Sequence, residues 1–182
     1  MTILPLTNSE DVMPLNKTKL SLTKIRIYSL LTVVALVAVD QVIKYFIDLY
    51  LKPIGSVTVI KNILQLSYYE NDGAMMGMMS GKILTMTVLA IICLLVIGFV
   101  IFSGKVKFGV DYCCIVLMIS GGLGNIIDRV FRGYVIDYIE VLFVDFYIFN
   151  FADCLVTCAA GIMICYQIHE IIKEKKAKTV ND

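Results

Sequence analysis

The chain of 182 residues is 59% hydrophobic and only 17% charged, whereas soluble domains carry about 45–50% apolar and about 25% charged residues. This composition excludes a domain that faces water on every side and predicts a membrane protein, with room for about four spans of about 20 residues each. The formal net charge of +1 excludes nucleic-acid binding through overall basicity.

The chain begins with a polar extension at residues 1–26, of which residues 1–21 are expected to be irregular. The extension contains four basic residues near its end: Lys17, Lys19, Lys24 and Arg26. A basic stretch before an apolar one is also typical of a cleaved secretory signal. No small-x-small cleavage site follows, however, and the apolar character continues past Lys44. We therefore predict an uncleaved first span at about residues 27–47.

Two loops differ in character from the spans around them. Residues 55–66 (GSVTVIKNILQL) alternate and are rich in β-branched side chains, and a turn-forming Asn71-Asp72-Gly73 step follows; the pattern predicts short strands in a small sheet. The segment from Arg132 to Asn150 is rich in aromatics, and we predict an irregular flap there. Its aromatics are typical either of an interfacial belt or of a lid over a site.

The other three spans are predicted at about residues 83–104, 108–128 and 151–172, with a basic tail at 173–182. Ten basic residues fall in the two terminal segments and the loop near residue 105, and five fall in the loops on the opposite side. By the positive-inside rule, both termini are expected in the cytoplasm and the two acid-rich loops outside. The predicted fold is an all-α membrane bundle of four helices with a small extracytoplasmic sheet and an outer flap.

Several types of site are disfavoured by the sequence. The six cysteines lie in apolar runs without histidines at ligand spacing and are interpreted as small hydrophobic residues: Cys93, Cys113, Cys114, Cys154, Cys158 and Cys165. The single histidine, His169, lies near the inner end of the fourth span, too far from the acids for a Ser-His-acid triad. No His-Glu-x-x-His motif of zinc proteases occurs. We predict neither a metal nor a cofactor.

Ionisable residues within spans are expensive, at about 2.5–3.5 kcal/mol each near the bilayer centre, and they point to function. Asp40 and Lys44 share one face of the first span and form either an ion pair that packs the bundle or a substrate contact. Asn125, Asp128 and Arg129 share a face at the outer end of the third span, after three glycines, Gly121, Gly122 and Gly124. That group forms either a packing seam with a polar cluster or part of a site.

Further acids are expected at the same end of the bundle. Asn150 and Asp153 fit an N-cap and a first-turn acid of the fourth span, and Asp137 lies in the outer loop. Two close carboxylates share a proton, so that one activates water and the other protonates a carbonyl oxygen. Such a pair hydrolyses a peptide bond without a metal or a covalent intermediate. The residues alone do not distinguish Asp128 from Asp137 and Asp153 as members of the pair.

Five segments in order resemble the lipoprotein signal peptidases (signal peptidase II) of bacteria: Asp40–Lys44 (DQVIK), Asn71–Ala74 (NDGA), Gly121–Arg129 (GGLGNIIDR), Gly133–Tyr138 (GYVIDY) and Phe149–Asp153 (FNFAD). The resemblance implies a multi-pass aspartyl endopeptidase of the bacterial plasma membrane with its active site near the outer face. Members of this family cleave prolipoproteins on the amino side of a diacylglyceryl-modified cysteine, so the implied partners are that substrate and membrane lipid. We expect a monomer.

The resemblance also assigns roles to residues. Asp137 and Asp153 match the catalytic pair. Eight further residues match positions that support the site or bind substrate: Asp40, Lys44, Asn71, Gly73, Asn125, Asp128, Arg129 and Asn150. The chain departs from the family where Met75 and Met76 follow the Asn-x-Gly-Ala segment, which leaves the shape of that loop over the substrate open.

Two functions of other classes are compatible with some of these residues. The first is a cation or proton carrier with Asp40, Lys44 and Asp128 as a relay. It is disfavoured because the polar residues cluster in the outer half and the second span is apolar throughout. The second is a non-catalytic lipoprotein-binding relative, which would have lost an acid, whereas both are present here.

Overall fold

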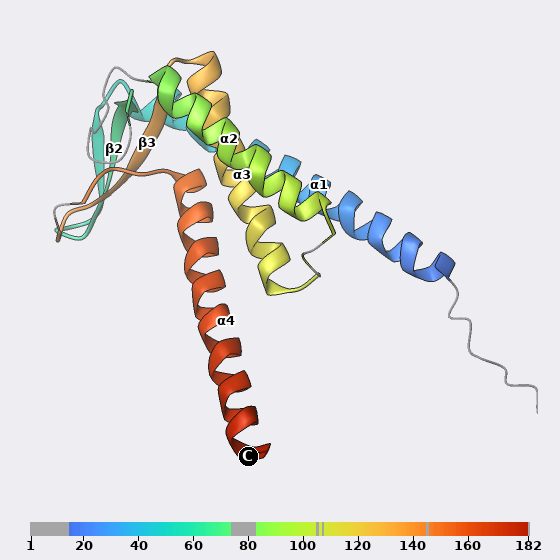
Figure 1. The fold of residues 1–182 in the computed structure, drawn as a ribbon. Helices are drawn as coiled ribbons and strands as arrows, with labels where there is room; N and C mark the ends of the chain where they lie inside the picture. The colour runs from blue at the N-terminus through green and yellow to red at the C-terminus, as the bar shows by residue number, and fades with distance from the viewer. Residues whose placement is uncertain (1–14, 74–82, 105, 107, 145, 182) are drawn as a thin grey trace, which may run out of the picture.

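The computed structural model describes residues 15–73, 83–104, 106, 108–144 and 146–181. Figure 1 shows their elements. They are, in chain order, helix α1 (Leu15–Phe46), the π-helical turn η1 (Ile47–Leu51), strands β1 (Ser56–Ile60) and β2 (Leu64–Asn71), helices α2 (Ile83–Phe102) and α3 (Val110–Phe131), strand β3 (Val135–Val141) and helix α4 (Phe151–Asn181). Met75 and Met76, where the chain departs from the family, lie outside the described residues.

The prediction of four membrane spans is confirmed, because all four helices are long and apolar enough to cross a bilayer. The expected irregular backbone at residues 1–21 is wrong where it overlaps α1, which already begins at Leu15. Residues 15–21 (LNKTKLS) contain neither Pro nor Gly, the residues that break helices, so the helix extends toward the N-terminus. Likewise α4 continues through the predicted tail to Asn181. Lys173 and Glu170 form an ion pair at 4.0 Å on this part of α4.

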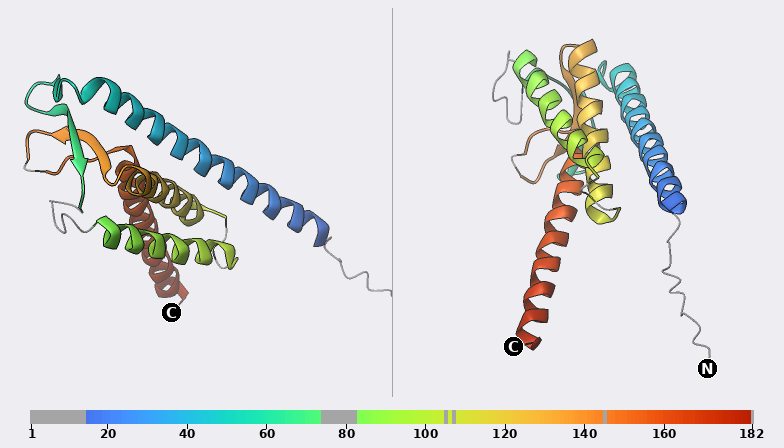
Figure 2. Two further views of the ribbon diagram at one scale, coloured as in Figure 1. Left: turned by 90° about the horizontal axis from the view of Figure 1, so that it is seen from above. Right: turned by 45° about the vertical axis from the view of Figure 1, so that its right-hand side comes forward.

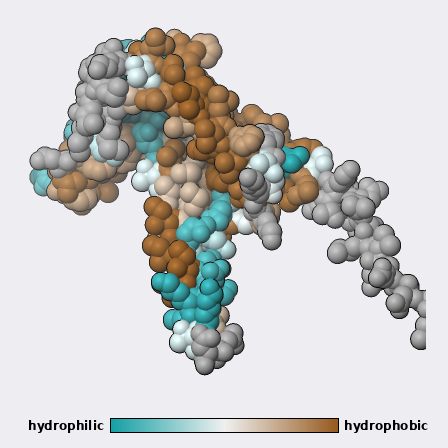
Figure 3. Space-filling view, in the orientation of Figure 1, coloured by the Kyte–Doolittle hydropathy of each residue, from teal (hydrophilic) through white to brown (hydrophobic). Residues whose placement is uncertain are grey.

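The helices gather around α3, which packs against each of the other three. Near the sheet the helices lie close together, whereas the start of α1 and the end of α4 diverge at the far end (Figure 2). The surface of the bundle is largely hydrophobic, and the last turns of α4 are hydrophilic (Figure 3). The molecule therefore has a sheet at one end and both described chain ends at the other.

The small predicted sheet is present and has three antiparallel strands in the order β1-β2-β3. Leu66 pairs with Val57 of β1 and with Ile139 of β3. The predicted irregular flap from Arg132 to Asn150 is wrong in its first half, because Val135–Val141 forms β3. Val135 to Tyr138 are all buried, so this strand lacks the alternation that identifies a half-exposed strand.

The sheet is fixed to the end of α1 by a hydrophobic core. Leu51, Ile136 and Tyr138 form its centre, and side chains of α1, η1 and β2 pack around them. Because side chains alternate along a strand, Ile136 and Tyr138 point to this core while Asp137 between them points the other way. Burial of the sheet therefore directs Asp137 toward the helices.

Glycines allow α3 to approach its neighbours closely. A Cβ atom at Gly121 would collide with the carbonyl oxygen of Ala152 on α4, and one at Gly124 would lie 2.6 Å from Asp40 Oδ2 on α1. Small residues at such contacts let membrane helices pack backbone to backbone. Gly121 and Gly124, which the sequence predicted to lie in a packing seam, thus form close contacts between helices.

Gly121→Ala is expected to lower the free energy of unfolding by about 1–3 kcal/mol, because the backbone of α4 has to move to make room for the methyl group. The matched control is Gly161→Ala on α4, where an added Cβ meets nothing within 4 Å. There the loss of backbone entropy in the unfolded chain leaves stability unchanged or raised by up to about 1 kcal/mol. Unfolding by titration with a denaturing detergent measures both, and equal effects would contradict the close contact.

Candidate active site

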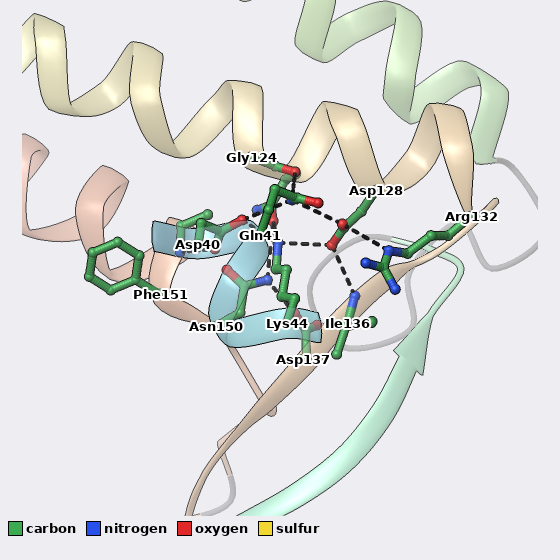
Figure 4. A network of polar contacts seen from close by, with 12 residues as sticks. Asp40, Gln41, Lys44, Gly124, Asp128, Arg132, Ile136, Asp137, Asn150 and Phe151 are labelled. Carbon is green, nitrogen blue, oxygen red and sulfur yellow. Dashed lines mark hydrogen bonds and ion pairs between the residues drawn. The ribbon is translucent and has the colours of Figure 1, made fainter. Parts of the chain in front are cut away.

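Lys44 is the centre of a buried polar network at the sheet end of the bundle (Figure 4). Its side chain is fully buried, and Nζ lies 2.9 Å from Asp40 Oδ2 and 2.8 Å from Asp128 Oδ2. It also donates a hydrogen bond of 2.9 Å to Asn125 Oδ1. Three acceptors from α1 and α3 thus surround one ammonium, as a buried charge requires.

The two acids of this network are themselves satisfied by further donors. Asp40 Oδ1 accepts from the backbone N–H of Ala152 at 3.2 Å, and Asp128 Oδ2 accepts from that of Ile136 at 3.3 Å. Both carboxylates are almost completely buried. Of the two interpretations of Asp40 and Lys44, the geometry favours the ion pair that packs the bundle. The ion pairs of Lys44 join α1 to α3, and the backbone hydrogen bonds to the two acids add α4 and β3.

Two residues of this network were not assigned a role from the sequence. Gln41 Nε2 donates to the carbonyl of Gly124 and to Asp128 Oδ1, both at 3.1 Å. Arg132 Nε lies 3.4 Å from Asp128 Oδ1. The spacing of four residues between Asp128 and Arg132 on one helix face would have indicated the second contact. No comparable pattern identifies Gln41.

Two asparagines connect the network to Asp137 and Asp153. Asn125 Nδ2 donates to Asp153 Oδ1 at 2.8 Å. Asn150 Nδ2 donates to Asp137 Oδ1 at 2.6 Å and to Asn125 Oδ1 at 3.1 Å. The oxygen of Asn125 therefore accepts from both Lys44 and Asn150. The amide of Asn125 fixes Asp153, while that of Asn150 fixes Asp137.

Asn150 and Asp153 also cap α4, as predicted. The backbone N–H of Asp153 donates to Asn150 Oδ1 at 3.0 Å, and that of Asn150 donates to Asp153 Oδ2 at 3.1 Å. This is a reciprocal capping arrangement. Asn150 can therefore cap the helix and belong to the site at the same time, because it forms hydrogen bonds with both Asp153 and Asp137. Asp153 lies in the first turn of α4, where the helix dipole favours a negative charge.

Asp137 reaches this cluster from β3. Its Oδ2 accepts from Asn71 Nδ2 on β2 at 2.8 Å, while Asn71 Oδ1 accepts from the backbone N–H of Gly73 at 3.0 Å. Burial, followed by the negative charge of Asp153, raises the pKa of Asp137 to about 7, although the Asn71 and Asn150 hydrogen bonds oppose the rise. A carboxyl group with this pKa carries a proton for a large part of the time at neutral pH.

Arg129 lies close enough to the acids for its charge to interact with Asp153, Asp137 and Asp128. Its Nε atom is buried and has no hydrogen-bond partner among the described residues. A buried donor without an acceptor is costly and is common where a ligand supplies the acceptor. The structure thus brings together all ten predicted site residues, although Gly73 contributes only its backbone N–H among the contacts described.

Four apolar helices with an amide-bridged pair of carboxyl groups beside a small sheet define a multi-span membrane protein with a paired-carboxylate site at one end. Residues 32–169 match the sequence profile of the family described as Signal peptidase (SPase) II. The chain belongs to this family of membrane peptidases, which confirms the resemblance of the five segments.

The relatives match along most of their length. The chain is 36% identical over 149 residues to the lipoprotein signal peptidase of Latilactobacillus sakei subsp. sakei (strain 23K), covering 82% of this chain and 96% of that protein. Its identity to the enzyme of the same name from Staphylococcus aureus (strain bovine RF122 / ET3-1) is 34% over 154 residues, covering 84% and 94%.

Two solved structures described as bacterial membrane enzymes have the same fold. One superposes with a TM-score of 0.72 at 33% identity, covering 79% of this chain and 89% of the other. The second superposes with a TM-score of 0.68 at 35% identity, covering 77% and 92%. The architecture of four helices and a small sheet is therefore common to this chain and to these enzymes.

Proposed function

We propose that this protein is an aspartyl endopeptidase that removes the signal peptide from diacylglyceryl-modified prolipoproteins, cleaving on the amino side of the lipidated cysteine. The observation that carries this proposal is the bridging of Asp137 and Asp153 by Asn150, at 2.6 Å and 3.1 Å. With a pKa of about 7 for Asp137, the pair holds one proton near neutral pH. One proton on two carboxyl groups is the state that acid/base hydrolysis requires.

In the first step, Asp153 is the base and Asp137 is the acid. Asp153 is ionised at the positive end of the α4 dipole and takes a proton from water as the water oxygen attacks the scissile carbonyl carbon. Asp137 donates its proton to the carbonyl oxygen. The product is a neutral tetrahedral gem-diol, and the proton has moved from Asp137 to Asp153.

In the second step, the two acids exchange roles. Asp153 gives its proton to the leaving nitrogen while Asp137 takes a proton from one hydroxyl of the gem-diol. The carbon–nitrogen bond breaks, which releases a carboxyl end on the signal peptide and an amino end on the lipidated cysteine. Both acids return to their starting state, so that neither a metal nor a covalent intermediate takes part.

Arg129 is the residue best suited to hold the substrate backbone. Its Nε is a buried donor without a partner among the described residues, and its charge reaches both Asp137 and Asp153. A peptide carbonyl bound there accepts a charge-assisted hydrogen bond. This contact places the scissile bond between the two acids, and positioning of this kind lowers the barrier.

The lipid of the substrate explains why such a site lies at the end of a helix bundle. Each buried methylene of an acyl chain contributes about 0.8 kcal/mol to membrane binding, so the diacylglyceryl group keeps the cysteine at the membrane surface. The excess of basic residues on the side of both termini supports a site near the outer face of the plasma membrane. The scissile bond and the acids then lie at the same depth.

The carrier hypothesis gains little from the geometry. Lys44 contacts both Asp40 and Asp128 within 3 Å, and these three residues form one compact cluster. A relay through the membrane needs polar groups along its whole depth, whereas α2 is apolar over its length. The peptidase hypothesis accounts for Asn150 and Asp137 as well.

A cleavage assay in detergent tests the proposed substrate. Purified protein is incubated with a diacylglyceryl-modified prolipoprotein and with an unlipidated copy, and products are separated on a gel. We expect cleavage of the lipidated substrate only, at the bond before the cysteine as located by mass spectrometry. Equal cleavage of both copies would refute the role of the lipid, and no cleavage by folded protein would favour the non-catalytic relative.

The pH profile tests the shared proton. Because the pKa of Asp137 is about 7, deprotonation above this pH removes the acid, and cleavage at pH 8 should be about tenfold slower than on the plateau. The hydrogen bond from Asn71 lowers this pKa, so Asn71→Ala raises it and moves the alkaline limb to higher pH. Thr58→Ala on β1 is the control and should leave the limb in place; a limb that moves to lower pH in Asn71→Ala would contradict the assignment.

A further inference from the structure

A second hollow lies at the opposite end of the bundle from the site. A cavity of about 700 Å³ separates the N-terminal half of α1 from the end of α2 and the start of α3. Figure 2 shows α1 standing apart from α3 in this half, whereas the two helices meet near the sheet. Among the described residues, none of those assigned to the site lines this groove. We call this cavity the α1–α3 groove.

The part of the α1–α3 groove between Arg26 and the sheet fits within one leaflet of a bilayer. It follows α1 from Arg26 to Val33, a rise of about 10 Å at about 1.5 Å per residue, and one leaflet is half of a hydrocarbon core of about 30 Å. From Leu51, beside the sheet, to Arg26 the helix rises by about 37 Å. With the sheet at the outer surface, as the proposed topology has it, Arg26 reaches the inner headgroups.

A positive charge lies among the described residues that line the groove. Arg26 is the one charged side chain among the described residues that line it, and it is exposed. No carboxylate of the described part of the chain forms an ion pair with Arg26 within 4 Å. An apolar groove with an unpaired arginine in its lining complements an apolar chain with an anionic end.

The floor of the groove is divided by one polar contact. The hydroxyl groups of Ser29 on α1 and Tyr112 on α3 hydrogen-bond at 3.1 Å. A smaller hollow of about 320 Å³ lies beyond this contact, between Thr32 of α1 and Leu117 of α3. The two hollows, one on either side of the contact between Ser29 and Tyr112, provide space for two acyl chains.

From this geometry we infer that the α1–α3 groove binds an anionic phospholipid of the inner leaflet. The lipid phosphate pairs with Arg26, and the two acyl chains lie on either side of the contact between Ser29 and Tyr112. The lipid fills the space where α1 and α3 diverge and thereby holds α1 to the bundle. This binding site is separate from the proposed peptidase site and needs no cleavage to be observed.

Native mass spectrometry of the purified protein, titrated with dioleoyl-phosphatidylglycerol or dioleoyl-phosphatidylcholine, tests the headgroup contact. We expect about fivefold tighter binding of phosphatidylglycerol, as one arginine near a lipid surface provides. Arg26→Gln should remove this preference. Lys24→Gln is the matched control, because Lys24 is an exposed cation two residues away that does not line the groove. Equal binding of the two lipids by the unmodified protein, or equal effects of the two variants, would overturn the inference.

A second pair of variants tests the acyl-chain contact. Val33 lines the groove, whereas Val34 beside it is 59% exposed and does not. Val33→Phe should reduce bound phosphatidylglycerol at least fivefold, and Val34→Phe should not change it. Unchanged lipid binding by Val33→Phe refutes the site. If the same variant instead slows cleavage of a lipidated prolipoprotein, the groove binds the signal peptide of the substrate and the lipid inference is wrong.

Discussion

Asp137→Asn is expected to abolish cleavage, lowering the rate by at least about 10²–10⁴-fold, the usual contribution of a positioned acid or base. The asparagine has nearly the same shape but has no carboxyl proton to give to the scissile carbonyl. Asp153→Asn should lower the rate as strongly, because it removes the base. Cleavage of a lipidated prolipoprotein at fixed enzyme concentration measures both variants.

A double variant and a control separate chemistry from folding. Because the two acids act as one unit, Asp137→Asn combined with Asp153→Asn should be no slower than either single variant. Glu140→Gln lies on the same strand, and its carboxylate accepts hydrogen bonds from Ser67 and Gln65 rather than from the site. This variant should retain activity. Normal cleavage by folded Asp137→Asn would rule out the proposed pair.

The positions of the four spans were predictable because the bilayer imposes them. A helix must present about 20 apolar residues to cross the hydrocarbon core, and α2 from Ile83 to Phe102 carries no charge at all. The strand at Val135–Val141 was not predicted, since burial on both faces removes the alternation of polar and apolar residues. Its many aromatic neighbours pointed instead to an irregular flap.

The candidate site was predictable only in part. Residues three or four apart on one helix face one another, so Asp40 and Lys44 were correctly paired. Spacing along the chain does not give the rotation of one helix against another, so the contact of Lys44 with Asp128 was not foreseen. The bridge from Asn150 to Asp137 joins a helix cap to a strand, and only the family resemblance selected Asp137 and Asp153.

Lys44→Met is expected to cause the largest loss of stability, about 3–5 kcal/mol, because it leaves buried Asp40 without a cation and buried Asp128 with Arg132 alone. Lys44 Nζ contacts Asp40 at 2.9 Å and Asp128 at 2.8 Å, and the three side chains are at most 1% exposed. Methionine fills a similar volume, so the loss comes from charge rather than from packing. Unfolding in a denaturing-detergent titration measures it.

An exposed lysine and a neutral triple variant decide whether burial of charge is the cause. Lys52 also pairs with two acids, Glu70 at 2.8 Å and Asp48 at 3.6 Å, but its side chain is 48% exposed, so Lys52→Met should lower stability by at most about 1 kcal/mol. Combining Lys44→Met with Asp40→Asn and Asp128→Asn removes all three charges and should restore much of the lost stability. If instead the triple variant is less stable than Lys44→Met, the hydrogen bonds that the carboxylates accept from Ala152 and Ile136 hold the helices together more than the ion pairs do.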